Sequence, residues 1–127
     1  MVMPYVSVTS NVPKSSVDIV EVSNAMANTL SDAFGFPAVY FMVQMELGVP
    51  MLLGLNDEVR SSDPAAYVHA RCIGRIDAER NPKTIAALTT TVSEVLKVPA
   101  ERVYVVLENV PVGNWGANGT TVIPVSE

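Results

Sequence analysis

The sequence predicts an α/β (α+β) fold in which two repeated β-α-β units form a mixed four-stranded sheet with two helices on one face. One observation is internal similarity: "VPKSSVDIVEVSNAMANTLSDAFGFPAVYFMV" and "NPKTIAALTTTVSEVLKVPAERVYVVLE" share the order Pro-Lys, helix, proline, strand with Val-Tyr. A second consideration is the handedness of β-α-β connections. Because these crossovers are right-handed, both helices are expected on the same face of the sheet. The other face, with its β-branched side chains, is then left for self-association.

The first repeat begins with a short strand and a helix. "YVSVTS" alternates apolar and polar residues from Tyr5, which predicts a strand that starts directly after Pro4. Either Ser15 or Ser16 can cap the following helix, which the spacing of apolar residues extends to Gly35. The residues expected on its buried face are Ile19, Val22, Met26, Leu30 and Ala33.

The middle of the chain contains a second strand and a polar loop. "AVYFMVQME", which starts at Ala38, is nearly all apolar and predicts a central strand covered on both faces. The polar stretch 54–64, "GLNDEVRSSDP", has turn-forming residues and no period, which predicts an exposed loop.

The second repeat contains two more strands around a helix. "AAYVHARCIG" predicts a strand, and Asn81 with Pro82 predicts a capped helix start. "AERVYVVLENV" predicts a fourth strand, and the tail has glycine turns around Trp115 before a β-prone end at 120–123. The residues expected on the buried face of the helix are Ile85, Leu88, Val92 and Val95 or Leu96.

Composition narrows the class of protein. The length of 127 residues predicts one domain, residues 1–127, and 49% hydrophobic residues predict that some apolar surface meets another subunit. The net charge is −5 and no basic stripe exists, so nucleic acid and membranes are not expected partners. The N-terminus lacks the pattern of a signal peptide, which predicts a cytoplasmic protein.

Common catalytic and metal-binding patterns are missing. Cys72 is the only cysteine, which excludes an internal disulfide and a multi-thiolate zinc site and predicts a small buried hydrophobe. His69 lies an odd number of positions from Cys72 on one strand, so the two side chains point to opposite faces and form no dyad. No metal or cofactor is expected, because these acids fall in predicted loops without ligand spacing: Asp57, Glu58, Asp63 and Asp77.

Pro4 is the remaining candidate for chemistry. Inside a chain, its nitrogen is an amide without basicity, whereas at an N-terminus it is a secondary amine that can act as a base. Composition and spacing alone favour a proline that simply begins a strand, where the missing N–H costs nothing.

Six short motifs add a family resemblance. Met-Pro before a strand, "NVP", "GFP", "CIGRI", "ERVYVVLE" and "NWGANGTT" occur in this order over nearly the whole chain. In this combination the sequence resembles the macrophage migration inhibitory factor (MIF) family of the tautomerase superfamily. The resemblance implies the tautomerase/MIF fold, a homotrimer with its sheets around a central channel, and no cofactor. It also implies that Pro4 is the catalytic base for keto–enol interconversion of a small aromatic 2-oxo acid or its enol, such as phenylpyruvate, or of dopachrome-type compounds.

The same resemblance assigns the other site residues. Ile73 matches one wall of the family's pocket, and Tyr104 matches an aromatic residue that the neighbouring subunit contributes. Phe36 in "GFP" stands where most members have a lysine that grips a substrate carboxylate. Val106 stands where animal members often have a polar side chain. These departures predict a less polar pocket and a weaker activity.

The rim of the pocket and the N-terminus also depart from the family pattern. Ala117 and Val122 replace rim aromatics, for which Trp115 is expected to compensate. If translation starts at Met1, Val2 and Met3 remain and the nitrogen of Pro4 is an amide. A start at Met3, followed by removal of methionine, exposes the amine.

Two functions therefore remain open at this stage. The first is a cofactor-free tautomerase with Pro4 as its base. The second is a cytokine-like or intracellular interaction trimer with a vestigial pocket, which acts on a receptor or other protein partner. That role would be exerted in the cytoplasm or after release by a leaderless route.

Overall fold

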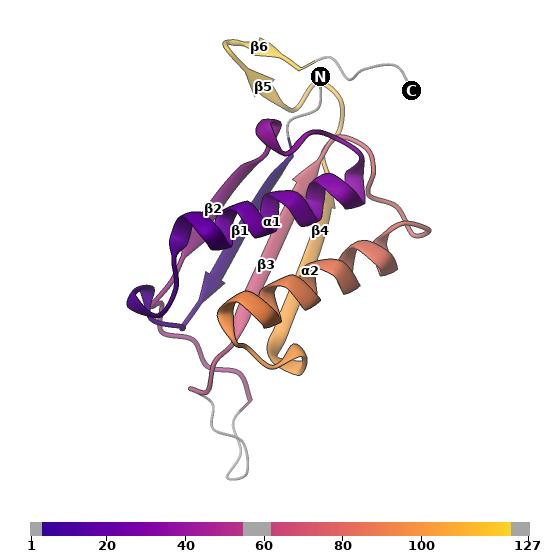
Figure 1. Cartoon of the computed structure of the whole chain (residues 1–127). Coiled ribbons are helices and arrows are strands. Elements are labelled where there is room, and N and C mark those ends of the chain that lie inside the picture. The colour runs from indigo at the N-terminus through magenta and orange to yellow at the C-terminus, as the bar shows by residue number, and fades with distance from the viewer. Residues whose placement is uncertain (1–3, 55–61, 123–127) are drawn as a thin grey trace.

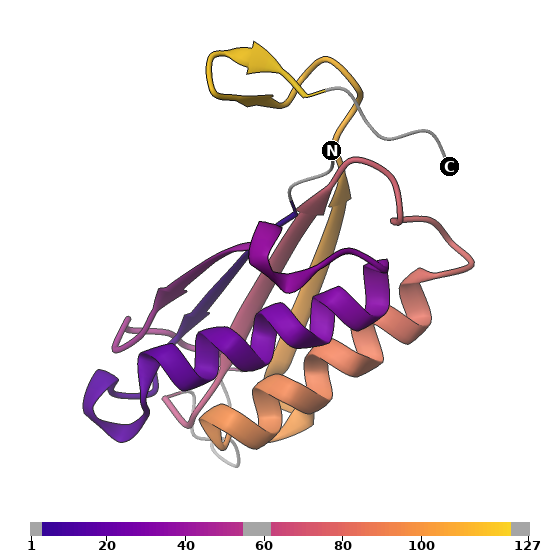
Figure 2. The same ribbon diagram turned by 45° about the horizontal axis from the view of Figure 1, so that its top comes forward.

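The computed structural model describes residues 4–54 and 62–122. Within them, a four-stranded sheet carries two helices on one face, and a small hairpin lies beyond one end of the sheet (Figures 1 and 2). The principal elements are β1 (Tyr5–Ser10), α1 (Ile19–Phe34), β2 (Met42–Glu46), β3 (Ala66–Cys72), α2 (Asn81–Leu96), β4 (Val103–Asn109), β5 (Gly116–Ala117) and β6 (Thr120–Thr121). Three short 3-10 helices are η1 (Lys14–Ser16), η2 (Ala38–Tyr40) and η3 (Ala100–Arg102).

The sheet is mixed and its strand order is β2-β1-β3-β4. Strands β1 and β2 pair in parallel, as do β3 and β4, so each β-α-β unit supplies one parallel pair. The antiparallel pairing of β1 with β3 joins the two units at the centre. The predicted fold class is confirmed.

Strand β2 corrects one prediction. It is an edge strand of this sheet, not a central one, because β1 is paired on its other side with β3. It is also shorter than predicted, since η2 takes up the first residues of the apolar run. The residues of β2 alternate between exposed and half-buried, so the strand is not covered on both faces.

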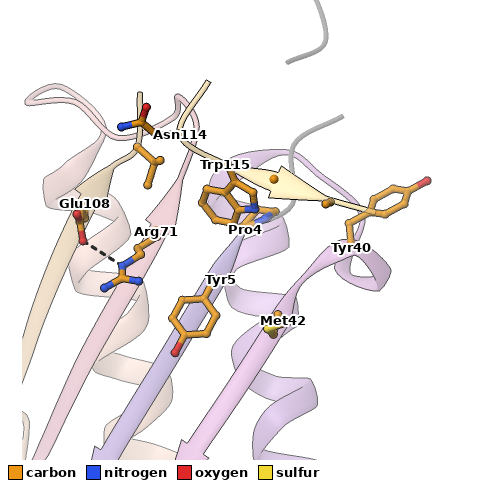
Figure 3. A pocket seen from close by; sticks show the side chains of 11 residues that line it. Pro4, Tyr5, Tyr40, Met42, Arg71, Glu108, Asn114 and Trp115 are labelled. Atoms are coloured by element: carbon orange, nitrogen blue, oxygen red, sulfur yellow. Dashed lines mark hydrogen bonds and ion pairs between the residues drawn. The ribbon is translucent and has the colours of Figure 1, made fainter. Parts of the chain in front are cut away.

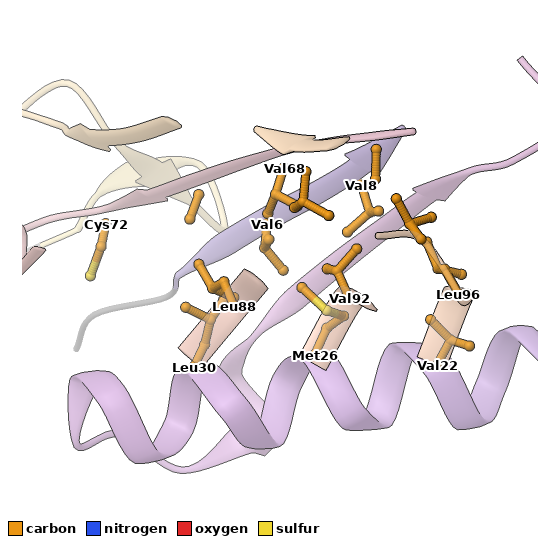
Figure 4. Close-up of a cluster of buried hydrophobic side chains, with 14 of the residues drawn as sticks. Val6, Val8, Val22, Met26, Leu30, Val68, Cys72, Leu88, Val92 and Leu96 are labelled. Carbon is orange, nitrogen blue, oxygen red and sulfur yellow. The ribbon is translucent and has the colours of Figure 1, made fainter. Parts of the chain in front are cut away.

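Alternate side chains of the strands build the core against the two helices. Val6 and Val8 of β1 and Val68 of β3 are fully buried under α1 and α2 (Figure 4). Cys72 is also fully buried, as predicted, and His69 on the same strand points to the opposite face, where it contacts Glu108. The helices contribute Val22, Met26, Leu30, Leu88, Val92 and Leu96 to this core.

The first helix begins later than the sequence predicts. Its cap is Asp18, not Ser15 or Ser16, because the carboxylate of Asp18 accepts hydrogen bonds from the backbone N–H groups of Val20 and Glu21. Ser16 ends the separate turn η1, where its hydroxyl donates to the carbonyl of Pro13 at 2.7 Å. The predicted end at Gly35 is confirmed, with that glycine in the left-handed conformation.

The second helix begins one residue earlier than predicted. Its cap is Arg80, so Asn81 is already helical, and the Asn81 side chain instead accepts from the backbone of Asp77. The buried faces of both helices repeat every four residues. This repeat places Phe34 inside in place of Ala33, and Thr84 in place of Ile85. The hydroxyl of Thr84 donates to the carbonyl of Arg80 at 3.3 Å, which reduces the cost of its burial. Ile19 lies before the buried repeat of α1 and is 40% exposed, whereas Ile85 lies one position after Thr84, off the buried face of α2, and is 37% exposed.

Two further points concern the rest of the chain. Most of the loop predicted at 54–64 lies outside the described residues, as do Asp57 and Glu58.

In the part of the chain that the structure describes, neither helix has the length and apolar character that a membrane span requires.

Candidate active site

The sheet face away from the helices carries a cross-strand row of four side chains. The backbone register aligns Tyr5 of β1 with Met42 of β2 and with Arg71 of β3, and it aligns Arg71 with Glu108 of β4. This row is one wall of a cavity of about 760 Å³ at the end of the sheet where β1 begins. Segment 114–117, which precedes and enters β5, supplies the opposite wall (Figure 3).

Pro4 is one of the residues that line this cavity. Its side chain is fully buried, and its carbonyl accepts a hydrogen bond of 3.0 Å from the backbone of Met42. Trp115 lies beside it in Figure 3, and Tyr40 lines the cavity farther from Pro4, on the side of β2. In the 127-residue sequence Met3 precedes Pro4, so the nitrogen is basic only in a chain that begins at Pro4.

The side of the cavity opposite Tyr40 is charged. One oxygen of Glu108, Oε1, accepts from Nε of Arg71 at 3.0 Å and lies 2.9 Å from Nε2 of His69. The hydrogen bond with His69 lowers the pKa of Glu108 most, and Arg71 lowers it further, while desolvation opposes them. The guanidinium carbon of Arg71 lies 5.8 Å from the centre of the Tyr5 ring, within the range of a cation–π contact.

Two of the predicted site residues, Pro4 and Trp115, line this cavity together, and so does Ala117, which the resemblance placed at the pocket rim. Phe36 and Ile73 do not line it in the described chain. The ring of Phe36 faces Arg75, whose guanidinium carbon is 4.9 Å from the ring centre. Ile73 follows β3 and is buried in the core.

Tyr104 and Val106 lie on the same open face of the sheet but in other rows. Tyr104 is paired with Tyr67, and Val106 with His69. These rows are farther from Pro4 than the row that contains Arg71, so neither residue lines the cavity of its own chain. They are 55% and 40% exposed, respectively.

Several lining residues were not predicted from the sequence. They come from the strands and from the segment after β4, and are Tyr5, Tyr40, Met42, Arg71, Glu108, Val110, Asn114 and Gly116. Strand alternation was a usable signal for two of them, because an inward Cys72 requires an outward Arg71, and Tyr5 alternates with the buried Val6. Their convergence depends on strand order and register, which a single sequence does not supply.

Within residues 4–54 and 62–122, no three side chains of His, Cys, Asp or Glu are placed to share a metal ion. The arrangement instead joins a buried proline, aromatic walls and one charged side. It suits an aromatic molecule that carries a polar or ionic group.

Comparison with known proteins identifies the family. The model of the family described as macrophage migration inhibitory factor (MIF) matches residues 3–123. The chain belongs to the MIF family. Among curated relatives, MIF-like protein mif-2 of Caenorhabditis elegans is 28% identical over 120 residues, covering 94% of this chain and 95% of the relative. Macrophage migration inhibitory factor of Meriones unguiculatus is 32% identical over 120 residues, covering 94% and 98%.

Solved MIF structures share the fold. The crystal structure of a macrophage migration inhibitory factor homologue from Prochlorococcus marinus has a TM-score of 0.82 at 28% identity, covering 92% of this chain and 97% of that chain. The MIF family match begins at Met3, directly before Pro4, and includes every residue that lines the cavity. The family resemblance of the sequence motifs and the predicted sheet are thus both confirmed.

Proposed function

We propose that this MIF-family chain is a cofactor-free keto–enol tautomerase whose base is the free amine of Pro4. The observation that carries the proposal is that a fully buried Pro4 lines a cavity together with the aromatic residues Tyr5, Tyr40 and Trp115. The amine would take a proton from the carbon next to a carbonyl, leaving an enolate. It would return a proton to the enolate oxygen to give the enol, or run the same steps in reverse.

The surroundings of Pro4 suit a base. Burial disfavours the charged form of an amine, so a buried terminal amine stays available to accept a proton near neutral pH. The Pro4 side chain is fully buried, and the cavity adds a nearby cation, Arg71. The rings of Trp115 and Tyr40 offer flat apolar surfaces to an aromatic substrate of the phenylpyruvate or dopachrome type.

We propose that the active form is a homotrimer. The open sheet face exposes Tyr67, Tyr104 and Val106, which are large side chains of the kind that interfaces bury. Tyr104 is too far along β4 for its own cavity, so it is suited to reach the cavity of another copy. A second subunit would thus complete a site that one chain leaves open.

The N-terminus provides the test. Two forms of the protein, one beginning at Pro4 and one of 127 residues, are compared for ketonisation of enol-phenylpyruvate, after intact mass has verified each N-terminus. We expect turnover by the form beginning at Pro4 and a loss of at least about 100-fold in the acylated form, as for removal of a positioned general base. Pro4→Gly in the shorter form should lose activity while the protein still assembles. Equal rates in all three, or none in any, would exclude the proposal.

A second function is favoured by Phe36 and the residues before Pro4. Phe36 supplies no charge for a substrate, and Val2 and Met3 keep the nitrogen of Pro4 acylated if they are retained. The alternative is a cytokine-like or intracellular trimer that binds a receptor or partner protein through its surface, in the cytoplasm or after leaderless release. Such an interaction would survive Pro4→Gly, whereas a catalytic role would not.

A further inference from the structure

Arg71 is the positively charged side chain in the cavity. Of the residues that line it in the described chain, Arg71 alone is a cation, and Glu108 alone is an anion. The two are next to each other in the cross-strand row, so the charge is confined to one side of the cavity. The opposite side contains Tyr40 and Met42 (Figure 3).

The guanidinium group is held through one of its nitrogens. Nε of Arg71 donates to Glu108 at 3.0 Å, and the Tyr5 ring lies beside the guanidinium carbon. Among the described residues, the two terminal nitrogens of Arg71 have no hydrogen-bond partner, and 47% of the side chain is exposed. A guanidinium has five N–H donors, so four of them remain for a ligand.

Glu108 neutralises Arg71 only in part. Its Oε1 is shared between Arg71 and His69, and the lowered pKa keeps Glu108 ionised near neutral pH. Glu108 therefore fixes the direction of the guanidinium and leaves its terminal edge available. A preorganised arginine loses less side-chain entropy when it binds an oxyanion.

We propose that Arg71 binds the carboxylate of an aromatic 2-oxo acid in this cavity. Arg71 would thus supply the positive charge that Phe36 does not provide. The inference rests on the proposed tautomerase function and adds to it the residue that selects substrates with a carboxylate. The terminal guanidinium edge matches a carboxylate with two parallel N–H···O bonds. In a 2-oxo acid the carboxylate is bonded to the carbonyl carbon. Arg71 is paired across the strands with Tyr5, which follows Pro4. Binding of the carboxylate by Arg71 therefore brings the carbon that loses its proton, next to the carbonyl, toward Pro4.

Arg71 is thus a specificity-determining residue. A neutral ester of the same acid keeps the reacting carbonyl and the aromatic ring but loses one charge-assisted contact. The chain should therefore favour the acid over the ester. Substitution of Phe36 should have little influence on the preference for the acid over the ester.

The kinetic test uses the form that begins at Pro4, with phenylpyruvate and its methyl ester as substrates. We expect Arg71→Met to lower kcat/KM for the acid by about 10- to 100-fold, mainly through KM, as for loss of a charge-assisted hydrogen bond. The ester should change by less than about twofold, and Arg71→Lys should restore part of the preference. The matched control is Arg80→Met, because Arg80 has a similar exposure and also pairs with a carboxylate, that of Asp77, outside the cavity. Equal losses for acid and ester in Arg71→Met would overturn the inference.

A binding test separates this inference from the proposed function. Trp115 is the only tryptophan of the chain and lines the cavity, so its fluorescence reports occupancy without turnover. Cinnamate and cinnamamide have the same ring and differ in the charge of the head group. We expect wild type to bind cinnamate at least about tenfold more tightly, and Arg71→Met to lose that preference. A preference without turnover supports carboxylate binding and rejects the tautomerase. Equal binding of both, no binding of either, or a preference that survives in Arg71→Met overturns the inference.

Discussion

Glu108 connects the chemistry of the cavity to the stability of the sheet. Its side chain, on β4, accepts from His69 and Arg71 on β3, so one carboxylate joins two strands across the open face. Because the largest contribution to its lowered pKa is the hydrogen bond with His69, the ionised form is favoured in the folded state. Folding and ionisation of Glu108 are therefore linked.

That linkage predicts a pH-dependent effect of Glu108→Gln. A carboxyl whose pKa is lower in the folded state stabilises the fold above its unfolded pKa, and this contribution disappears as pH falls through the folded pKa. The difference in Tm between wild type and Glu108→Gln should be largest near about pH 7 and shrink toward about pH 3. Thermal unfolding followed by circular dichroism measures it, with Glu94→Gln on the exposed side of α2 as control. A difference that is constant over this range would contradict the linkage.

The site was only partly predictable residue by residue. The motif resemblance identified Pro4 and Trp115, and both line the cavity. Arg71 and Glu108 were missed because their partnership arises from the parallel register of β3 and β4, not from spacing in the sequence. The sequence showed that Phe36 replaces a lysine. It did not show that Arg71 could supply a positive charge instead, because Arg71 is placed beside Tyr5 only by the antiparallel register of β1 and β3.

At the scale of elements, helix α1 offers a direct test of which residue caps it. Asp18→Ala removes the acceptor for two backbone N–H groups, and we expect a loss of about 1 kcal/mol in the free energy of unfolding. Ser15→Ala should change it by less than about 0.5 kcal/mol, because no side-chain cap is formed at the start of η1. Denaturant unfolding of both variants measures the effect. A larger loss of unfolding free energy in Ser15→Ala than in Asp18→Ala would contradict the assignment of Asp18 as the cap.

The elements themselves were largely predictable, and their ends and environments less so. The helices were identified by the spacing of their apolar residues, and the four strands of the main sheet by alternation or by apolar, β-prone runs. The apolar run wrongly predicted that β2 is a central strand. Such a run indicates that a strand is buried, but it does not tell whether helices of the same chain or another subunit cover the strand. Asp18 was missed as a cap because the serines before it satisfy the same local rule, and η1 uses one of them for a different turn.

At the scale of the whole molecule, the open sheet face differs from the one that the sequence predicts. β-Branched side chains such as Val6, Val8 and Val68 point to the helices, so the open face is not dominated by them. It combines the cross-strand row at the cavity, which includes the charged pair Arg71 and Glu108, with a band of large side chains at Tyr67, Tyr104 and Val106. The charged pair Arg71 and Glu108 near Pro4, and the large exposed side chains farther along the strands, divide the face into a site and a surface suited to association.

This division predicts that Tyr104→Glu disrupts the proposed homotrimer without unfolding the chain. Tyr104 is 55% exposed, so a glutamate there costs little in an isolated subunit, whereas a buried carboxylate at an interface is strongly unfavourable. We expect sedimentation to show monomers, far-ultraviolet circular dichroism to stay unchanged, and tautomerase turnover to fall at least about tenfold, because the neighbouring wall of each cavity is lost. Val20→Glu is the matched control, since Val20 is 68% exposed on α1, away from the open face. Intact trimers of Tyr104→Glu, or the same dissociation in Val20→Glu, would show that this face is not the specific interface.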